Sequence, residues 1–206
     1  MLQIAILGFG VVGSGTAEVI TQNQKQISAY CGDEVNVKYI LDLRDFPDHP
    51  LGDRVVRDIN IILNDPEVVL VGEMMGGAHP AYDFTLASLK AGKHVVTSNK
   101  ELFAKHWSEL ELEAKKMNVG LFFEASCVGG VPIIRTLLDG MQANHIQSMM
   151  GIVNGTTNYI LSAMTDAGLD FGEMLKKAQE LGYAEKNPAA DVEGHDTCRK
   201  ISILAS

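Results

Sequence analysis

The chain has 206 residues, 46% of them hydrophobic, and a formal net charge of −9 at pH 7, so it can bury a substantial core and is unlike a disordered chain. The acidic balance, without a stripe of Lys and Arg, argues against nucleic acid or an anionic membrane as partner, and no apolar run approaches the ~18–20 residues that span a bilayer. Three widely separated cysteines, Cys31, Cys127 and Cys198, favour reduced thiols over a disulfide framework or a thiolate zinc site. We therefore expect a cytoplasmic protein with a small-molecule ligand.

Short β-rich runs alternate with helical stretches over the first 124 residues. The strand candidates are residues 4–7, 35–43, 68–73, 94–97 and 120–123. Repeated strand–helix–strand order predicts an α/β fold of the Rossmann type, a doubly wound parallel sheet covered on both faces. Apolar residues at helical spacing from Phe103 to Met117 predict the buried face of a helix over residues 100–118.

A glycine fingerprint, G-x-G-x-x-G, follows the first predicted strand directly and precedes a helical stretch. Gly8 would allow a tight turn, Gly10 the close approach of backbone to a pyrophosphate, and Gly13 the close packing of helix on strand. The helix N-terminus would add amides and a partial positive charge. We predict a dinucleotide site here, against the alternative of a glycine-rich turn without a ligand. Its residues are Gly8, Phe9, Gly10, Val11, Val12 and Gly13.

The end of the second predicted strand offers two residues that could read the adenosine ribose. Asp42 would accept hydrogen bonds from the ribose hydroxyls and disfavour a 2′-phosphate, whereas Arg44 would bind that phosphate through its positive charge. We favour NADP through Arg44, with NAD as the alternative. Either residue could instead be a solvated charge at a strand end.

After Glu124 a glycine-rich bend marks the predicted boundary between a dinucleotide-binding domain, residues 1–124, and the start of a second domain, residues 125–206. In the second part we expect helices at residues 133–139, 157–165 and 170–181, and a strand at residues 146–153. The third helix should bury Phe171, Met174, Leu175, Ala178 and Leu181. The apolar end of the chain indicates a truncation.

Residues 182–200 crowd carboxylates and a lysine into one loop and one helix start. Asp191 follows a turn-like segment and is a natural N-cap, which places Asp196 and Lys200 four residues apart on one helix face. Such a cluster suits an amine-bearing substrate and a proton donor. An ordinary surface ion pair is the alternative.

Six ordered motifs together resemble the homoserine dehydrogenase family, over nearly the whole chain. They are GFGVVG at residues 8–13, GEMMGG at 72–77, AGKHVVTSNK at 91–100, FEASCVGGVPII at 123–134, GIVNGTTNYIL at 151–161, and DTCRK ending at Lys200. The resemblance implies NAD(P)-dependent interconversion of aspartate 4-semialdehyde and homoserine, in the biosynthesis of threonine, methionine and isoleucine. It also implies that the second domain is the first part of an α+β substrate and dimerisation domain, within a homo-oligomer.

The resemblance implies roles for individual residues. Lys200 would carry acid/base catalysis, Glu185 and Asp196 would bind the substrate, and Gly182, Glu185 and Lys100 would contact the cofactor. Asp191 would support the substrate residues or cap its helix, and the cap is the interpretation that we favour. His195, next to Asp196, is an alternative general acid with a more convenient intrinsic pKa.

A monovalent cation, typically sodium, would be held by backbone carbonyls in the glycine-rich bend. The residues that match the family here are Glu124, Cys127, Gly129 and Val131. A structural hinge without an ion is the alternative.

Two other functions remain open at this point. One is a different two-domain NAD(P) oxidoreductase with the same dinucleotide half, and the other is a non-catalytic module that senses NAD(P)H. The GIVNGTTNYIL motif and the set of Glu185, Asp196 and Lys200 count against the other oxidoreductase. The retained carboxylate–lysine set counts against the sensor, because a sensor needs no proton donor.

Overall fold

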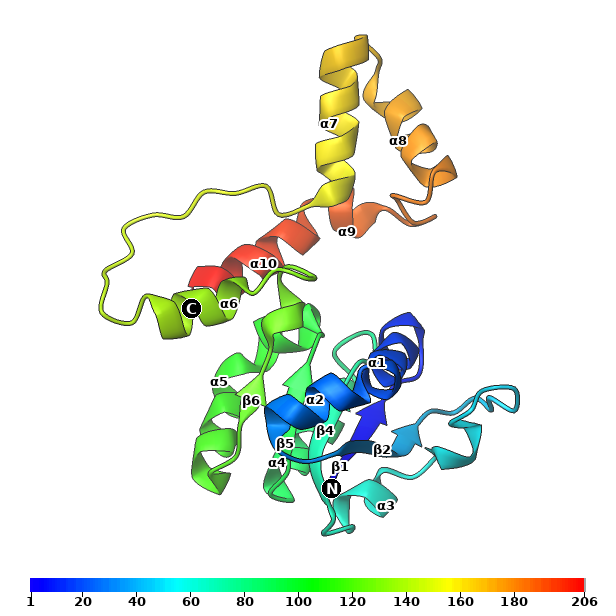
Figure 1. Ribbon diagram of the computed structural model, residues 1–206. Coiled ribbons are helices and arrows are strands. Elements are labelled where there is room, and N and C mark those ends of the chain that lie inside the picture. The colour runs from blue at the N-terminus through cyan, green and yellow to red at the C-terminus, as the bar shows by residue number, and fades with distance from the viewer. Residues whose placement is uncertain (206) are drawn as a thin grey trace. The chain divides into compact units, whose positions relative to one another are not determined.

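The computed structural model describes residues 1–205 (Figure 1). The chain divides into two compact units, Met1–Ser126 and Cys127–Ser206. The sequence predicted a boundary after Glu124, and Ser206, the last residue of the second predicted domain, lies outside the described residues. No helix within residues 1–205 has both the length and the hydropathy that a membrane span requires.

The first unit contains a six-stranded sheet in the order β3-β2-β1-β4-β5-β6, and every neighbouring pair is parallel. The strands are β1 (Leu2–Leu7), β2 (Val35–Leu41), β3 (Val55–Val56), β4 (Val68–Glu73), β5 (His94–Thr97) and β6 (Leu121–Phe122). β1 and β4 are adjacent although two strands separate them in sequence, so the strand order reverses there. In open α/β sheets, ligands bind at the carboxyl ends of the strands at such a reversal.

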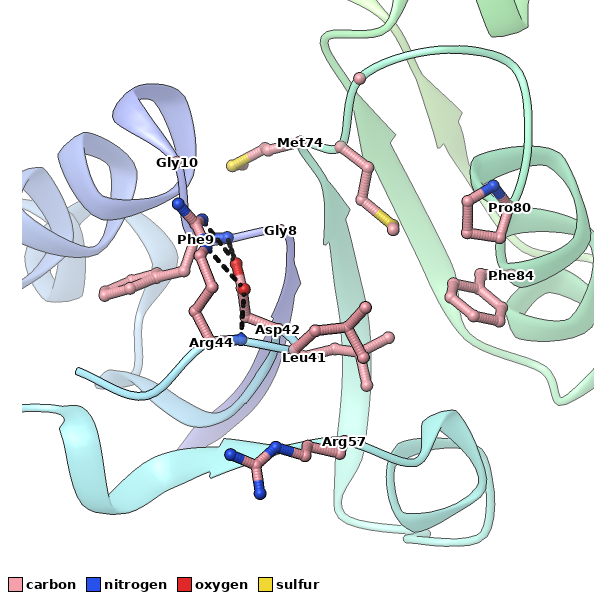
Figure 2. Close-up of a pocket in the computed structure, with 13 residues that line it drawn as sticks. Gly8, Phe9, Gly10, Leu41, Asp42, Arg44, Arg57, Met74, Pro80 and Phe84 are labelled. Atoms are coloured by element: carbon pink, nitrogen blue, oxygen red, sulfur yellow. Dashed lines mark hydrogen bonds and ion pairs between the residues drawn. The ribbon is translucent and has the colours of Figure 1, made fainter.

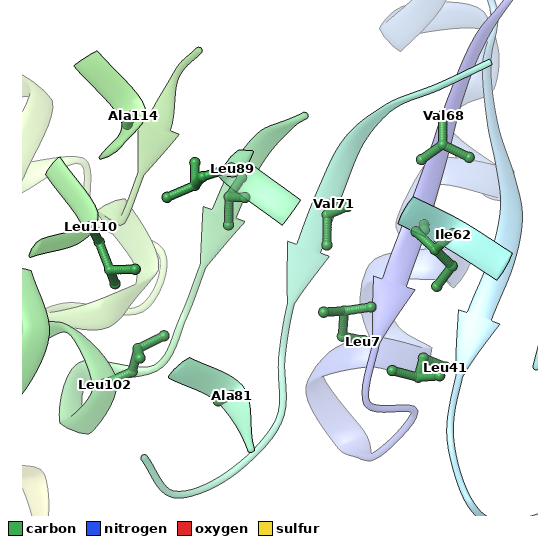
Figure 3. Close-up of a cluster of buried hydrophobic side chains, with 12 residues drawn as sticks. Leu7, Leu41, Ile62, Val68, Val71, Ala81, Leu89, Leu102, Leu110 and Ala114 are labelled. Atoms are coloured by element: carbon green, nitrogen blue, oxygen red, sulfur yellow. The ribbon is translucent and has the colours of Figure 1, made fainter. Parts of the chain in front are cut away.

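Helices cover the sheet of the first unit. They are α1 (Val11–Gln22), α2 (Gln24–Cys31), α3 (Ile59–Leu63), α4 (Ala81–Lys90) and α5 (Lys100–Met117), with 3₁₀ turns at η1 (Gly52–Arg54) and η2 (Glu124–Ser126). On one face, Leu7 and Val71 pack with Ile62 of α3, Leu89 of α4 and Leu110 of α5 (Figure 3). Each such fully buried side chain contributes about 1.5–3 kcal/mol.

The opposite face of β1 and β2 packs against α1. Ile4, Ile6 and Ile40 form a second buried cluster with Ala17 of that helix. The strands therefore bury side chains on both faces, as parallel strands between helices do. The predicted doubly wound Rossmann-type sheet is confirmed.

The predicted elements of the first unit match the structure closely. The strands at residues 68–73 and 94–97 are confirmed with identical bounds, and the helix predicted at residues 100–118 is α5. Asn99 caps α5 by accepting a hydrogen bond from the Leu102 amide at 3.0 Å, and Asn118 ends it in the left-handed conformation. The two-residue strand β3 was missed, because two residues carry no periodic signal.

The described residues of the second unit contain helices and no strand. The helices are α6 (Ile133–Arg135), a π-helical turn η3 (Thr136–Gly140), α7 (Gly155–Ala167), α8 (Phe171–Glu180), α9 (Ala189–Val192) and α10 (His195–Ala205). α7 and α8 lie side by side (Figure 1) and bury Ile160 against Met174 and Ala178. Phe171 and Leu181 are partly exposed, so the buried face predicted for α8 is only partly correct.

Two predictions for the second unit are wrong. Residues 146–153 form extended coil, because no neighbouring strand within the described residues supplies the backbone hydrogen bonds that a strand needs. Asp191 does not cap the helix that carries Asp196 and Lys200. It lies inside the short helix α9, and α10 starts afresh at His195.

Candidate functional site

The glycine fingerprint forms a tight turn between β1 and α1. Gly8 has a φ of +88°, and a Cβ there would lie 3.0 Å from the Met74 carbonyl oxygen. A Cβ on Gly13 would lie only 2.0 Å from the Gly8 carbonyl oxygen, so helix and turn touch through backbone alone. Gly10 has no atom within 4 Å of its Cβ position and caps α1 without a side chain. No side chain caps the first amides of α1, and the N-terminus of a helix is a site that binds anions.

A cavity of about 520 Å³ opens beside this turn, at the carboxyl ends of β1, β2 and β4 (Figure 2). Its lining is mainly apolar, with charges at one end, as in small-molecule sites. The lining residues are Gly8, Phe9, Gly10, Leu41, Asp42, Leu43, Arg44, Arg57, Met74, Met75, Gly76, Pro80 and Phe84. Among the other predicted cofactor residues, Val11 and Val12 begin α1 with exposed side chains, while the Phe9 ring is buried against Phe46.

Asp42 and Arg44 form a closed pair in this cavity. One Asp42 oxygen accepts from Arg44 Nε at 3.0 Å and the other from Arg44 Nη2 at 2.9 Å, while the Phe9 amide donates to Asp42 at 2.8 Å (Figure 2). The Arg44 guanidinium holds the pKa of the Asp42 carboxyl well below its usual range. Asp42 thus ties the glycine turn to the end of β2, and the Arg44 side chain, 61% exposed, presents its charge to the cavity.

Arg57 is a lining residue that the sequence did not predict. It follows β3 directly, and its exposed guanidinium pairs with Asp45 at 2.6 Å. Two arginines therefore line the same cavity. The position of Arg57 could not be predicted from the sequence, because Arg57 is brought beside the end of β2 by the short strand β3, which the sequence did not predict.

A buried carboxylate network fixes the loops around the cavity. Glu73, at the end of β4, accepts from the Thr97 hydroxyl at 2.5 Å and from the Met75 amide at 2.8 Å. Burial raises the pKa of Glu73, although its hydrogen bonds oppose that shift. Asn99 donates to the Gly77 carbonyl at 2.6 Å, and Lys100 follows as the first residue of α5. Lys100 lies at the carboxyl edge of the sheet but outside the lining of the cavity.

In the second unit, Asp196 and Lys200 form an ion pair at 2.7 Å on one face of α10. The side chains are 7% and 15% exposed, so this is not the ordinary surface pair that was the alternative. Lys200 Nζ also donates to the Val153 carbonyl oxygen at 2.6 Å. The ammonium is thus held by one carboxylate and one backbone carbonyl.

Asn154 links this pair to a second carboxylate. Its amide nitrogen donates to Asp191 at 2.7 Å and to Asp196 at 2.9 Å. Asp191 therefore belongs to the hydrogen-bonded cluster of Asp196 and Lys200. The GIVNGTTNYIL motif contains Asn154, but no role for this residue could be predicted from the sequence.

Two other predicted residues lie apart from that cluster. Glu185 is exposed in the loop after α8, and its backbone carbonyl accepts from the Gln179 side chain at 3.0 Å. Gly182 ends α8 with a φ of +79°. The alternative acid His195 is exposed and contacts Glu193 at 3.1 Å, away from the face that carries Lys200.

The predicted cation residues fall on both sides of the division between the units. Glu124 opens η2 in the first unit, whereas Cys127, Gly129 and Val131 lie in the second. Cys127 is buried, and its thiol lies 3.8 Å from the Lys200 carbonyl oxygen. Across residues 1–205 no three His, Cys, Asp or Glu side chains gather as a metal site would need, so the carbonyl-based hypothesis gains no support from side chains.

Two family models match the chain. Residues 8–124 match the homoserine dehydrogenase NAD binding domain, and residues 132–206 match a domain described as homoserine dehydrogenase. Homoserine dehydrogenases from Bacillus subtilis and from Synechocystis are each 42% identical over nearly the whole chain. The chain spans about half the length of these curated relatives, 48% in both cases.

Solved structures of similar proteins agree with these matches. A homoserine dehydrogenase from Thiobacillus denitrificans superposes with a TM-score of 0.93 at 39% identity, covering 99% of this chain and 48% of that protein. A hyperthermophilic archaeal homoserine dehydrogenase in complex with NADPH superposes with a TM-score of 0.80 at 28% identity, covering 98% of this chain and 68% of that protein.

Proposed function

The chain belongs to the homoserine dehydrogenase family, and we propose that it carries the dinucleotide site and the proton-transfer site of an enzyme that interconverts homoserine and aspartate 4-semialdehyde. One observation supports this most strongly. A single chain combines a fingerprint turn beside a cavity with a nearly buried lysine–carboxylate pair. The family match does not favour a different oxidoreductase or a non-catalytic sensor.

The residues of the first unit fit an NAD(P) cofactor. The uncapped start of α1 and the open space at Gly10 suit a pyrophosphate, and the cavity beside them can take the adenosine end. When bound, the nicotinamide would accept hydride from homoserine or deliver it to the aldehyde. Lys100 would contact the cofactor in the first unit, and Gly182 and Glu185 in the second.

We assign a preference for NADP to the charged end of the cavity. Arg44 occupies both oxygens of Asp42, so the carboxylate that would read an unmodified ribose is already committed. The exposed guanidinium of Arg44, with that of Arg57 in the same lining, would pair with a 2′-phosphate. NAD stays the alternative cofactor.

Lys200 is the proposed acid/base group. Its ammonium would donate a proton to the alkoxide that forms as hydride reaches the aldehyde, and its neutral amine would take that proton back in the oxidation of homoserine. Asp196 holds the ammonium in one place at 2.7 Å. Glu185 and Asp196 would bind the ammonium of the substrate, with Asp191 in support.

Other parts of the proposal concern the whole protein. A sodium ion held by carbonyls of Glu124, Cys127, Gly129 and Val131, a homo-oligomeric assembly and a cytoplasmic location stay predictions. They fit the family and rest on the sequence alone. The biosynthesis of threonine, methionine and isoleucine is the pathway that such an activity would serve.

The test is homoserine-dependent reduction of NADP or NAD, followed by the absorbance of the reduced nicotinamide. It uses the full-length enzyme, meaning a chain as long as the curated relatives, with the 206-residue chain beside it. We expect turnover at full length, and dinucleotide binding with little or no turnover in the 206-residue chain. A full-length protein that binds NADP yet never oxidises homoserine would overturn the proposal.

A further inference from the structure

Asn154 lies at the centre of the hydrogen-bonded cluster that contains Asp191 and Asp196. Its side chain is buried, with 6% of the residue exposed. Its amide nitrogen, Nδ2, donates a hydrogen bond to each carboxylate of the cluster, at 2.7 Å to Asp191 Oδ1 and at 2.9 Å to Asp196 Oδ2. Asp191 lies in α9 and Asp196 in α10, so this nitrogen joins two separate elements.

The oxygen of the same amide fixes which way the side chain points. Asn154 Oδ1 accepts from the Thr157 amide at 2.8 Å and from the Thr157 hydroxyl at 2.9 Å, which caps the start of α7. Turning the amide over would place its nitrogen against an N–H donor and its oxygen against two carboxylates. The two N–H bonds must therefore face Asp191 and Asp196. Among residues of this size, only asparagine supplies both the cap and the two donors.

The neighbouring backbone completes the arrangement. Lys200 Nζ donates to the Val153 carbonyl oxygen at 2.6 Å and pairs with Asp196 Oδ2 at 2.7 Å, the oxygen that also accepts from Asn154. Residues 153 and 154 thus hold both members of the ion pair, one through a carbonyl and the other through an amide.

We propose that Asn154 is a positioning residue, which keeps Asp191 and Asp196 together and through Asp196 fixes the ammonium of Lys200 for proton transfer. This inference rests on the proposed function, because it assigns Asn154 a task in the step that Lys200 performs. The physical reason is that two like charges in a poorly solvated site repel unless a donor lies between them. Without the amide, the repulsion between the two carboxylates is no longer offset, so we expect Asp196 to move away from Asp191 and to carry the ammonium of Lys200 with it.

Two substitutions remove the two amide N–H donors and keep the helix cap. Asn154→Ser retains a good cap without a charge, and Asn154→Asp retains both the cap and the shape. We expect both to lower kcat by about 10- to 100-fold, the scale of a misplaced catalytic group, with the Kd for NADP unchanged. Asp170→Ser is the matched control, because Asp170 caps α8 through the Gly172 amide at 2.8 Å and holds no second carboxylate. This control should keep the kcat of the wild type.

A double substitution separates positioning from general damage to the fold. If Asn154 acts through Lys200, Asn154→Ser should change kcat by less than about 2-fold in a Lys200→Ala background, because residues that act as a unit are not additive. An undiminished loss in that background would overturn the inference. Wild-type enzyme that fails to oxidise homoserine would instead contradict the proposed function.

A second measurement needs no activity. In the 206-residue chain, the acylation rate of Lys200 by an amine-directed reagent is followed by mass spectrometry, with the exposed Lys176 of α8 as internal reference. Asn154→Ser should speed the labelling of Lys200 relative to Lys176 several-fold, whereas Asp170→Ser should not. An unchanged ratio in Asn154→Ser would refute the inference whatever the enzyme catalyses.

Discussion

Gly13→Ala is the substitution for which the structure gives the sharpest expectation. The new Cβ would lie 2.0 Å from the Gly8 carbonyl oxygen, whereas real Cβ atoms essentially never approach such an atom within 3.0 Å. The start of α1 must therefore move by about 1 Å relative to the turn, and both sides of the contact are backbone. Overpacking of this kind costs about 1–3 kcal/mol, and more where no side chain can yield.

Gly15→Ala is the matched control for this change. Gly15 lies in the same helix, and its Cβ position has no atom within 4 Å. Alanine there should stabilise the helix by up to about 1 kcal/mol. Since both variants gain helix propensity, the difference between their unfolding free energies isolates the clash. Urea denaturation followed by circular dichroism measures that difference. Equal stabilities for the two variants would refute the close contact between helix and turn.

The remaining predictions concern the cofactor and the pH dependence of stability. Gly10→Ala should unfold like the wild type, because its Cβ position is open, yet bind NADP more weakly by fluorescence titration; unchanged binding would place the pyrophosphate elsewhere. Arg44→Ala should raise the KM for NADP by the equivalent of about 1.5–3 kcal/mol and leave the KM for NAD nearly unchanged, and equal effects on both would remove Arg44 from the phosphate site. Burial raises the folded-state pKa of Glu73, so its contribution to stability is fully present below the unfolded pKa and is lost as pH rises through the folded pKa. Glu73→Gln should flatten that fall in a series of denaturation curves, and an unaltered pH profile would contradict the cause assigned to it.

The sheet of the first unit could be predicted because its signals are local. Each long strand is a short apolar run, and Gly8 and Gly13 stand where one turn demands them. The helix with Phe103 and Leu110 on its inner face repeats its period over 18 residues. Such local patterns predict a strand, a turn or a helix without knowledge of the rest of the fold.

The predictions that failed depend on contacts between distant residues. The segment 146–153, with Ile146 and Ile152, has residues that favour a strand, but the described residues contain no neighbouring strand with which it could pair. Asp191 has the sequence context of a cap, yet its carboxylate is used by Asn154, 37 positions away. Arg57 reaches the cavity only through the short pairing of β2 with β3. No local pattern reports such contacts.

The most direct test of the central claim is the kcat of Lys200→Ala in the full-length enzyme, measured as homoserine-dependent NADP reduction. A lost general acid–base group predicts a fall of about 10²–10⁴-fold, and the Kd for NADP should stay near that of the wild type because the proposed phosphate site lies at the start of α1, in the other unit. Lys200→Arg should rescue little, since guanidinium keeps the charge but does not readily give up a proton. If Lys200→Ala keeps kcat within a few-fold of the wild type, Lys200 is only an ion-pair partner of Asp196, and Lys100 or His195 must carry the proton.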